Sequence, residues 1–545
     1  MRAAIFLTIS LSLLPACSNE QPTTANVIPQ ANAARVEAHI RFLADDLLQG
    51  RDTGSTGYAI AANYVAAEFA QLGVKPAGDN GSYFQPITFR QAFRTEAAPH
   101  LLIHTANGDE TFSYRDEFIT GPSLNELQQE VTAPLVFVGY GIDADWLDHH
   151  DYTGLDLNGK IAVILGGMPE SFPSEEGAHF SNRKYDEAVA RGAVGIITLQ
   201  TPVTEKVYPF AMRLQTLHMP NMSYLDKDGN PADSLPQIKG SAALSMDASA
   251  RLFALAGQSL DEVYATIERG LIPRGFDMNL TATLQRQSRH ESITSPNVIG
   301  LIEGSDPELK NEYVVFTAHL DHVGLATGDE EDNIYNGALD NAAGVAALLE
   351  NARLLTSLPT PPRRSILFTI VTGEEKGLLG ADYFAHNPTV PIHSIVANVN
   401  LDMPVILYPF TDVIAFGAEH STLKDSAEAA LKALNLTLMD DPMPEEGIFV
   451  RSDHYAFVQQ GVPSIFLATG FGSSDPALDG EAIFNDFLAN HYHQVSDSVD
   501  LPIDYQAGAL FAQVNFLIGL EVANADGRPR WNENDFFGVE FSRDN

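Results

Sequence analysis

The sequence predicts an α/β fold, in which a three-layer α/β/α domain is built on a largely parallel, mixed sheet. From about residue 297 onward, short apolar and β-branched runs alternate with segments of helical periodicity. The run EYVVFTAHLD is almost continuously apolar, which is typical of a strand covered by helices on both faces. This alternation predicts parallel strands whose carboxyl ends gather at one edge, where the functional groups of such folds lie.

The predicted elements follow one another along the whole chain. A helical pattern over 34–48 leads into the turn GRDTGSTG, and a second amphipathic helix continues to about residue 72. Short strands and one helix, at 184–191, occupy the stretch from 132 to about 200. The later strands are NVIGLIEG, EYVVFTAHLD, RRSILFTIV, SIVANVNLDM and VPSIFLATG, and helices such as AAGVAALLENARLL and 506–524 lie between or after them.

Length and charge limit the classes of function. The chain has 545 residues, more than one ordinary hydrophobic core holds, so we expect at least two domains. Its 71 acidic and 32 basic side chains give a formal net charge of -39. A surface of this sign repels phosphates, so we expect no nucleic-acid partner. We interpret the acidity as a solubility feature.

The first residues predict export. Arg2 precedes an apolar run over 3–14 that is too short to cross a bilayer but suits a signal peptide. The run ends in LPAC, which resembles the bacterial lipoprotein cleavage box, although Pro15 departs from it. We therefore predict a signal peptide over 1–16 and a tether over 17–32, lipidated at Cys17, the chain's one cysteine. The expected location is the periplasmic side of the bacterial outer membrane, and otherwise the periplasm or the medium.

Carboxylates and histidines stand at the ends of the predicted strands or in the loops after them. They are His319 and Asp321 in AHLDH, Asp340 in LDNAAG, Glu374 and Glu375 in GEE, Asp402 in NLDM, and His493 in YHQVSD. Taken singly, each has an ordinary explanation, because aspartates cap helices and histidines lie on surfaces. Together, carboxylates that leave buried strands are costly unless a cation receives them, and this mixture of oxygen and imidazole donors suits zinc.

In this order and spacing, these segments resemble the zinc peptidase family of bacterial leucyl aminopeptidases, aminopeptidase Y and glutamate carboxypeptidase II. The likeness covers about 285–522 and includes GRDTGSTG and RSDHYAFVQQGVPSIFLATG. It implies two Zn²⁺ per chain, bridged by Asp340. His319 and Asp402 would complete the first metal site, and Glu375 and His493 the second.

The same resemblance implies roles for residues outside the ligand set. Glu374 would be the general base, and Asp321 would orient His319 as a carboxylate behind the ligand. In the family the peptide bond after the bridging aspartate is often cis. Many relatives carry Asp after that residue, where this chain has Asn341.

The stretch over 116–250 resembles a protease-associated domain. The resemblance depends on the pattern FVGYGI, GKIAVI and AVARGAVGII. We predict this small, β-rich α/β insert over 116–250, within a catalytic domain formed by 33–115 and 251–545. The alternative is an unrelated small α/β domain, and we assign no chemistry to the insert.

The resemblance, together with the predicted signal peptide, implies an exported dinuclear zinc aminopeptidase, which would remove N-terminal residues from peptides by means of metal-activated water. One alternative on the same scaffold is a carboxypeptidase or dipeptidase, in which Arg451 would receive the substrate carboxylate. The others are a glutaminyl cyclase-type transferase with a single zinc and a non-catalytic, receptor-like binding module. His454, Tyr455 and Tyr492 are candidates for stabilising the oxyanion. Side-chain specificity and oligomeric state are not predicted.

Overall fold

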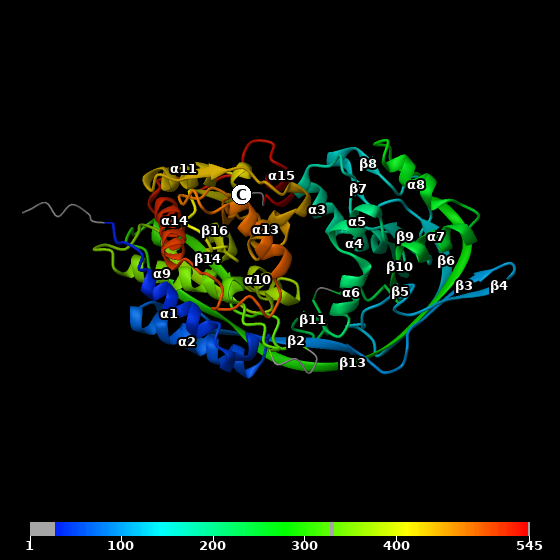
Figure 1. Ribbon diagram of the computed structural model, residues 1–545, viewed down its shortest axis with the longest axis horizontal. Helices are drawn as coiled ribbons and strands as arrows, with labels where there is room; N and C mark the ends of the chain where they lie inside the picture. The colour runs from blue at the N-terminus through cyan, green and yellow to red at the C-terminus, as the bar shows by residue number, and fades with distance from the viewer. Residues whose placement is uncertain (1–27, 233, 327–331, 543–545) are drawn as a thin grey trace, which may run out of the picture.

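The structure is a computed structural model that describes residues 28–232, 234–326 and 332–542. The predicted signal peptide and Cys17 lie outside the described residues, so export and lipid anchoring stay predictions. Figure 1 shows two lobes that lie side by side. One long strand, β13 (Phe276–Ile302), runs from one lobe to the other and belongs to the sheets of both.

The first lobe contains a mixed sheet with a parallel centre. β14 (Tyr313–His319) pairs in parallel with β15 (Ser365–Val371) and β16 (Ile395–Leu401), and β19 (Ser464–Thr469) extends the parallel run beyond β16. The flanks are antiparallel, because the end of β13 pairs with β15 and β17 (Asp412–Phe416) pairs with β19. The predicted α/β class and largely parallel sheet are therefore confirmed.

Helices cover both faces of this sheet, as the apolar strands require. Val314 and Phe316 of β14 point into the larger core, whereas Val315 between them packs on the opposite face. The helices over the larger core are α1 (Ala33–Leu43), α2 (Thr56–Leu72), α9 (Gly344–Thr356), α11 (Leu423–Ala433) and α14 (Tyr505–Asn524). Those over the other face are α10 (Leu379–His386) and α12 (His454–Val458). By length and composition α14 could cross a membrane, but 72% of its most apolar stretch is buried inside the protein.

The second lobe has a sheet and a hydrophobic core of its own. Its central strands are β6 (Gln128–Phe137), β9 (Ile161–Leu165), β10 (Gly195–Leu199) and β12 (Ser241–Leu244), which pair in parallel in that order. β3 (His100–Thr105) and the first half of β13 extend this sheet beyond the predicted insert of 116–250. The division into domains, and the likeness of this lobe to a protease-associated domain, stay predictions.

One element differs from the sequence expectation. The predicted strand NVIGLIEG is only the last part of β13, which begins at Phe276. The polar run QRQSRHES hides this continuity, because the strand is partly exposed where it passes between the lobes and therefore shows no apolar repeat there. A register shift between Asp277 and Thr281, with Asn279 at a φ of 55°, bends the strand within the second sheet.

A buried ion-pair cluster joins the two lobes. His420 of the first lobe donates to Asp535, which precedes α15 (Phe536–Phe541), over 2.5 Å. Its other ring nitrogen donates to Glu175 of α3 (Ser174–Asn182) in the second lobe. Burial alone lowers the pKa of His420, but the hydrogen bonds and charges of Asp535 and Glu175 outweigh it and raise the pKa to about 10.

This cluster predicts a pH-dependent stability. Because the pKa of His420 is higher in the folded protein than its ordinary value of 6.5, its stabilisation is complete below about pH 6.5 and is lost as the pH rises through about 10. We expect His420→Gln to lower the thermal unfolding midpoint clearly at pH 6 and much less at pH 10. A difference between the two proteins that is the same at every pH would contradict the charged state of His420.

Candidate metal centre

The five predicted ligands come together at the carboxyl edge of the first sheet. His319 is the last residue of β14, Asp402 follows β16, and Glu375 lies in the turn after β15. Asp340 stands just before α9, and His493 lies in the loop after α13 (Gly480–Asn490). The side chains of the first four are almost fully buried, whereas that of His493 is 37% exposed.

Asp340 lies between two pairs of donors. Its Oδ1 atom is 3.2 Å from Nε2 of His319, which in turn is 2.9 Å from Oδ1 of Asp402. Its Oδ2 atom is 3.1 Å from Nε2 of His493, which is 3.0 Å from Oε2 of Glu375. Each carboxylate oxygen of Asp340 thus faces a different histidine and a different acid.

The donor set fits two zinc ions. Two atoms that each lie about 2.1 Å from one zinc ion at a tetrahedral angle are about 3.4 Å apart, and the donor atoms around Asp340 are 2.9 to 3.2 Å apart. Oδ2 of Asp340 is buried and makes no hydrogen bond among the described residues, although His493 is near. Imidazole nitrogens and carboxylate oxygens are also the ligands that zinc prefers among these residue types.

The charges of the cluster show what a cation would replace. Burial lowers the pKa of His493, but the charge of Glu375 and hydrogen bonds to Asp340 and Glu375 raise it to about 11. The protein without metal therefore holds a proton on this imidazole. Zinc binds the neutral form, so a bound cation would take over the role of that proton.

Glu374 stands beside the donor pairs rather than within them. Its Oε2 atom is 3.9 Å from Nε2 of His319, and its side chain is 14% exposed. Burial raises its pKa well above the usual value, and the nearby charges of Asp402 and Glu375 add to this against the opposing charge of His319. This carboxylate faces the cavity next to the donors, as a proton acceptor must.

Asp321 differs from its predicted contact. Nδ1 of His319 lies 3.1 Å from the backbone carbonyl oxygen of Asp321, so the backbone orients the imidazole. The Asp321 carboxylate accepts instead from the hydroxyl of Thr53 at 3.0 Å and from the backbone N–H of Glu374 at 3.2 Å. The carboxylate therefore holds the turn that carries Glu374, and Asp321 contacts His319 through its backbone carbonyl rather than through its carboxylate.

Three further side chains support the predicted ligands, and none of them was predicted as a site residue. His322 is fully buried and its Nδ1 atom is 2.7 Å from Oε1 of Glu375. Ser452 donates to Oδ2 of Asp402 over 2.6 Å. Asp497 accepts the backbone N–H groups of Leu339 and Asp340 over 2.9 and 3.0 Å.

The peptide bond between Asp340 and Asn341 is cis, as the resemblance implied. The side chain of Asn341 donates to the carbonyl of Leu401 over 3.0 Å and accepts from the backbone N–H of Gly344 over 2.9 Å. An amide supplies both a donor and an acceptor here, which an ionised carboxylate cannot do. Asn341 thereby connects the loop of Asp340 to the strand that leads into Asp402.

A cavity of about 580 Å³ opens onto the donors. His319, Asp340, Glu374 and Asp402 line its floor, and its walls are mostly apolar. These wall residues include Met403, Phe416, Met443, Phe466, Phe471, Phe484, Leu488 and Tyr492.

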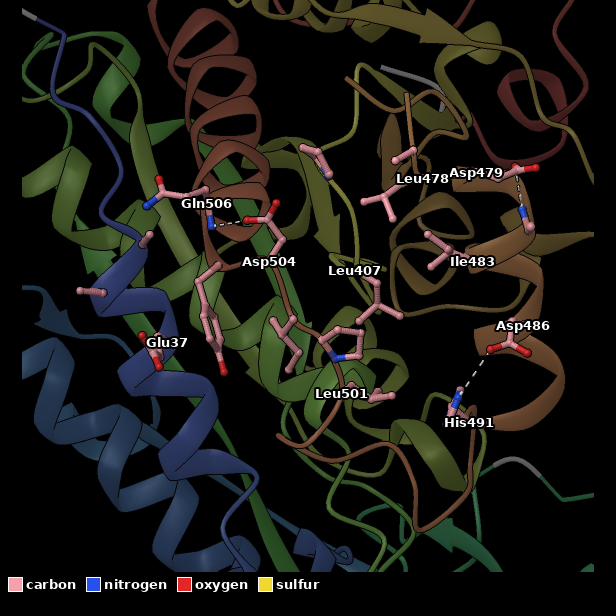
Figure 2. Close-up of a pocket in the computed structure, with 18 residues that line it drawn as sticks. Glu37, Leu407, Leu478, Asp479, Ile483, Asp486, His491, Leu501, Asp504 and Gln506 are labelled. Carbon is pink, nitrogen blue, oxygen red and sulfur yellow. Dashed lines mark hydrogen bonds and ion pairs between the residues drawn. The ribbon is translucent and has the colours of Figure 1, made fainter. Parts of the chain in front are cut away.

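A larger cavity of about 1090 Å³, shown in Figure 2, lies on the other side of α13. It is lined by His491 rather than His493, so it is separate from the donor cluster.

The segment that holds all these donors resembles a known protein family. Residues 297–517 match the model of peptidase family M28. Aminopeptidase NAALADL1 of Mus musculus is 26% identical over 312 residues, which are 50% of this chain and 38% of that protein. A probable leucine aminopeptidase 2 of Aspergillus oryzae is 27% identical over 202 residues, which are 35% of this chain and 37% of that protein. The matches thus span less than two fifths of either relative.

A solved structure shares the fold over nearly the whole chain. The aminopeptidase from Aneurinibacillus sp. strain AM-1 superposes with a TM-score of 0.52 at 21% identity, covering 92% of this chain and 95% of that one. This likeness concerns the fold. The sequence match, by contrast, includes every predicted ligand and Glu374. Residues 297–517 of the chain are thus similar to peptidase family M28.

Proposed function

We propose that this protein is a dinuclear zinc aminopeptidase, which hydrolyses N-terminal residues from peptides. The observation that carries the proposal is the position of Asp340 between two complete donor pairs. The names of the similar proteins, which are aminopeptidases, support the same activity. Two pairs favour two metals over the single zinc of a cyclase, and an intact donor set argues against a non-catalytic binding module.

The surrounding residues suit peptide hydrolysis. Bound zinc would polarise the scissile carbonyl and lower the pKa of water. Glu374 would accept the proton from the attacking water and pass it to the departing amine. Three carboxylate ligands against two divalent cations leave one positive charge, which favours an anionic tetrahedral intermediate.

Tyr492 is the best of the three candidates for contact with that anion. Its ring stacks on His493 with the centroids 3.9 Å apart, and it lines the cavity. Burial raises its pKa well above the usual value, so the phenol keeps the proton that it would donate. His454 is fully buried away from the cavity lining, and the hydroxyl of Tyr455 is engaged with His179 at 2.5 Å.

The environment of Arg451 favours one polarity of peptide binding over the other. Among the lining residues that the structure describes, it is the one lysine or arginine, and a carboxypeptidase would need it to receive the substrate carboxylate. Its Nη1 atom is already 2.9 Å from Oε2 of Glu446, and both side chains are partly exposed. The charge of Arg451 is thus compensated within the protein, which favours the aminopeptidase over the carboxypeptidase.

The two donor pairs predict a specific pattern of zinc loss. We expect about two zinc ions per wild-type chain and about one in His493→Ala, because only the pair with Glu375 loses a donor. Asp340→Ala should weaken both sites. Zinc is measured by elemental analysis after dialysis against buffered zinc. His491→Ala is the matched control, because its ring contacts Ser496 and lines the other cavity. A wild-type chain that never binds a second zinc would contradict the proposal.

The role of Glu374 predicts a loss of turnover without a loss of metal. We expect Glu374→Gln to lower kcat on free-amine aminoacyl substrates by about 100-fold or more, because general-base catalysis contributes about this much. Zinc content should stay that of the wild type. Glu521→Gln, an exposed position on α14, serves as the control. Wild-type turnover in Glu374→Gln would eliminate this carboxylate as the base.

A further inference from the structure

The segment Gly50–Thr53 supplies no ligand, yet it contacts the loops that carry most of them. We propose that this segment, which we call the GRDT frame, positions the metal centre by holding the loops that carry the ligands. Arg51 is its main positioning residue. The inference rests on the proposed metal centre, and it gives a role to a motif to which the resemblance assigned none. The frame lies more than 260 residues away in sequence from each loop that it contacts.

Arg51 holds two of these loops through their backbone. Its guanidinium is 1% exposed and donates to the carbonyl of Leu320 over 3.0 Å, and to those of Asn336 and Gly337 over 2.6 and 3.1 Å. It also donates to the carbonyl of Leu43, at the end of α1. Leu320 lies directly after the ligand His319, and Gly337 is three residues before Asp340. One side chain thus fixes both loops relative to α1.

The next two residues reach the third loop. The carboxylate of Asp52 lies 3.0 Å from Nζ of Lys376, which directly follows the ligand Glu375. Thr53 donates to Oδ2 of Asp321 over 3.0 Å, and Oδ1 of Asp321 accepts from the backbone N–H of Glu374. The frame therefore contacts the loops of His319, Asp340 and Glu375.

The backbone of the frame is built for close approach. Gly50 has a φ of +68°, and a Cβ atom there would collide with the carbonyl oxygens of Gly324 and Tyr335. The carbonyls of Gly50 and Arg51 accept from the backbone N–H groups of Gly324 and His322 over 3.2 and 3.3 Å. The frame is thus bonded to the chain that continues from His319 through both its backbone and its side chains.

Arg51 also carries a charge that the centre needs. Burial lowers its pKa to about 10, and the charges of Asp497, Asp340, Asp321 and Glu375 oppose that effect, so the guanidinium stays protonated near neutral pH. Its bonding partners are carbonyls rather than carboxylates. The positive charge therefore remains available to offset the acidic cluster as a whole.

Lysine is not an adequate replacement at this position. The planar guanidinium presents five N–H donors in a fixed fork, and here it reaches four carbonyls from three separate parts of the chain. A lysine would keep the charge but has three donors on one atom. We therefore expect Arg51→Lys to retain part of the function and Arg51→Met to lose more.

The test compares two buried arginines. Arg364 is also 1% exposed and donates to three backbone carbonyls, those of Val522, Ala525 and Gly527, at the opposite end of the sheet from the donors. We expect Arg51→Met to weaken zinc binding by at least about 10-fold, as measured by competition with a chelator, because changing a residue that supports metal ligands typically has an effect of this size. We also expect kcat to fall by a larger factor than KM rises. Arg51→Lys should lie between Arg51→Met and the wild type, and Arg364→Met should lower the thermal unfolding midpoint without changing zinc affinity.

Wild-type zinc affinity in a folded Arg51→Met protein would overturn the proposal. If that variant does not fold, Thr53→Val, which removes only the hydrogen bond to Asp321, decides instead. Weaker zinc binding or a lower kcat in Thr53→Val supports the frame, and wild-type values of both overturn it. A wild-type protein that binds zinc but cleaves no free-amine substrate would refute the proposed function without affecting this comparison, because zinc affinity is read independently of turnover.

Discussion

The structure depends on the burial of several carboxylates at one edge of a hydrophobic sheet. Asp340, Asp402 and Glu375 lie within about a hydrogen bond's reach of two histidines, and Asp321 and Glu374 are beside them. Like charges in a buried site repel one another and lose their hydration, so the cluster needs cations. The raised pKa of His493 is a sign of this need. In the proposed centre, two divalent ions held by these residues would meet that need.

The apolar sheet fixes where the loops of the site begin, and contacts from residues outside the ligand set hold those loops in place. The buried strands β14, β15 and β16 end at the same edge, so the residues after them start from fixed positions. Backbone contacts then fix the loops: Asp497 holds the N–H groups before α9, and Arg51 holds the carbonyls around His319 and Asp340. The predicted ligands are thus held largely by groups outside the predicted ligand set, as a preorganised site requires.

The candidate ligands could be chosen from the sequence because His319, Glu375 and Asp402 follow recognisable apolar strands, and because the order of all five segments resembles a known family. The atoms that support the ligands could not. Strand alternation places His319 and Asp321 on one face, but the sequence does not show that the chain turns after Asp321 and brings His322 against Glu375. Nor does it show that the carbonyl of Asp321, rather than its carboxylate, faces the imidazole. The length of β13 was hidden for a related reason, because its polar middle lies between two lobes.

The most direct measurement of the central claim is anomalous X-ray diffraction at the zinc absorption edge, from crystals of the protein grown with zinc. We predict two peaks on opposite sides of Asp340, one beside His319 and Asp402 and the other beside Glu375 and His493. A single peak at full zinc saturation, or a peak that Asp340 does not contact, would contradict it.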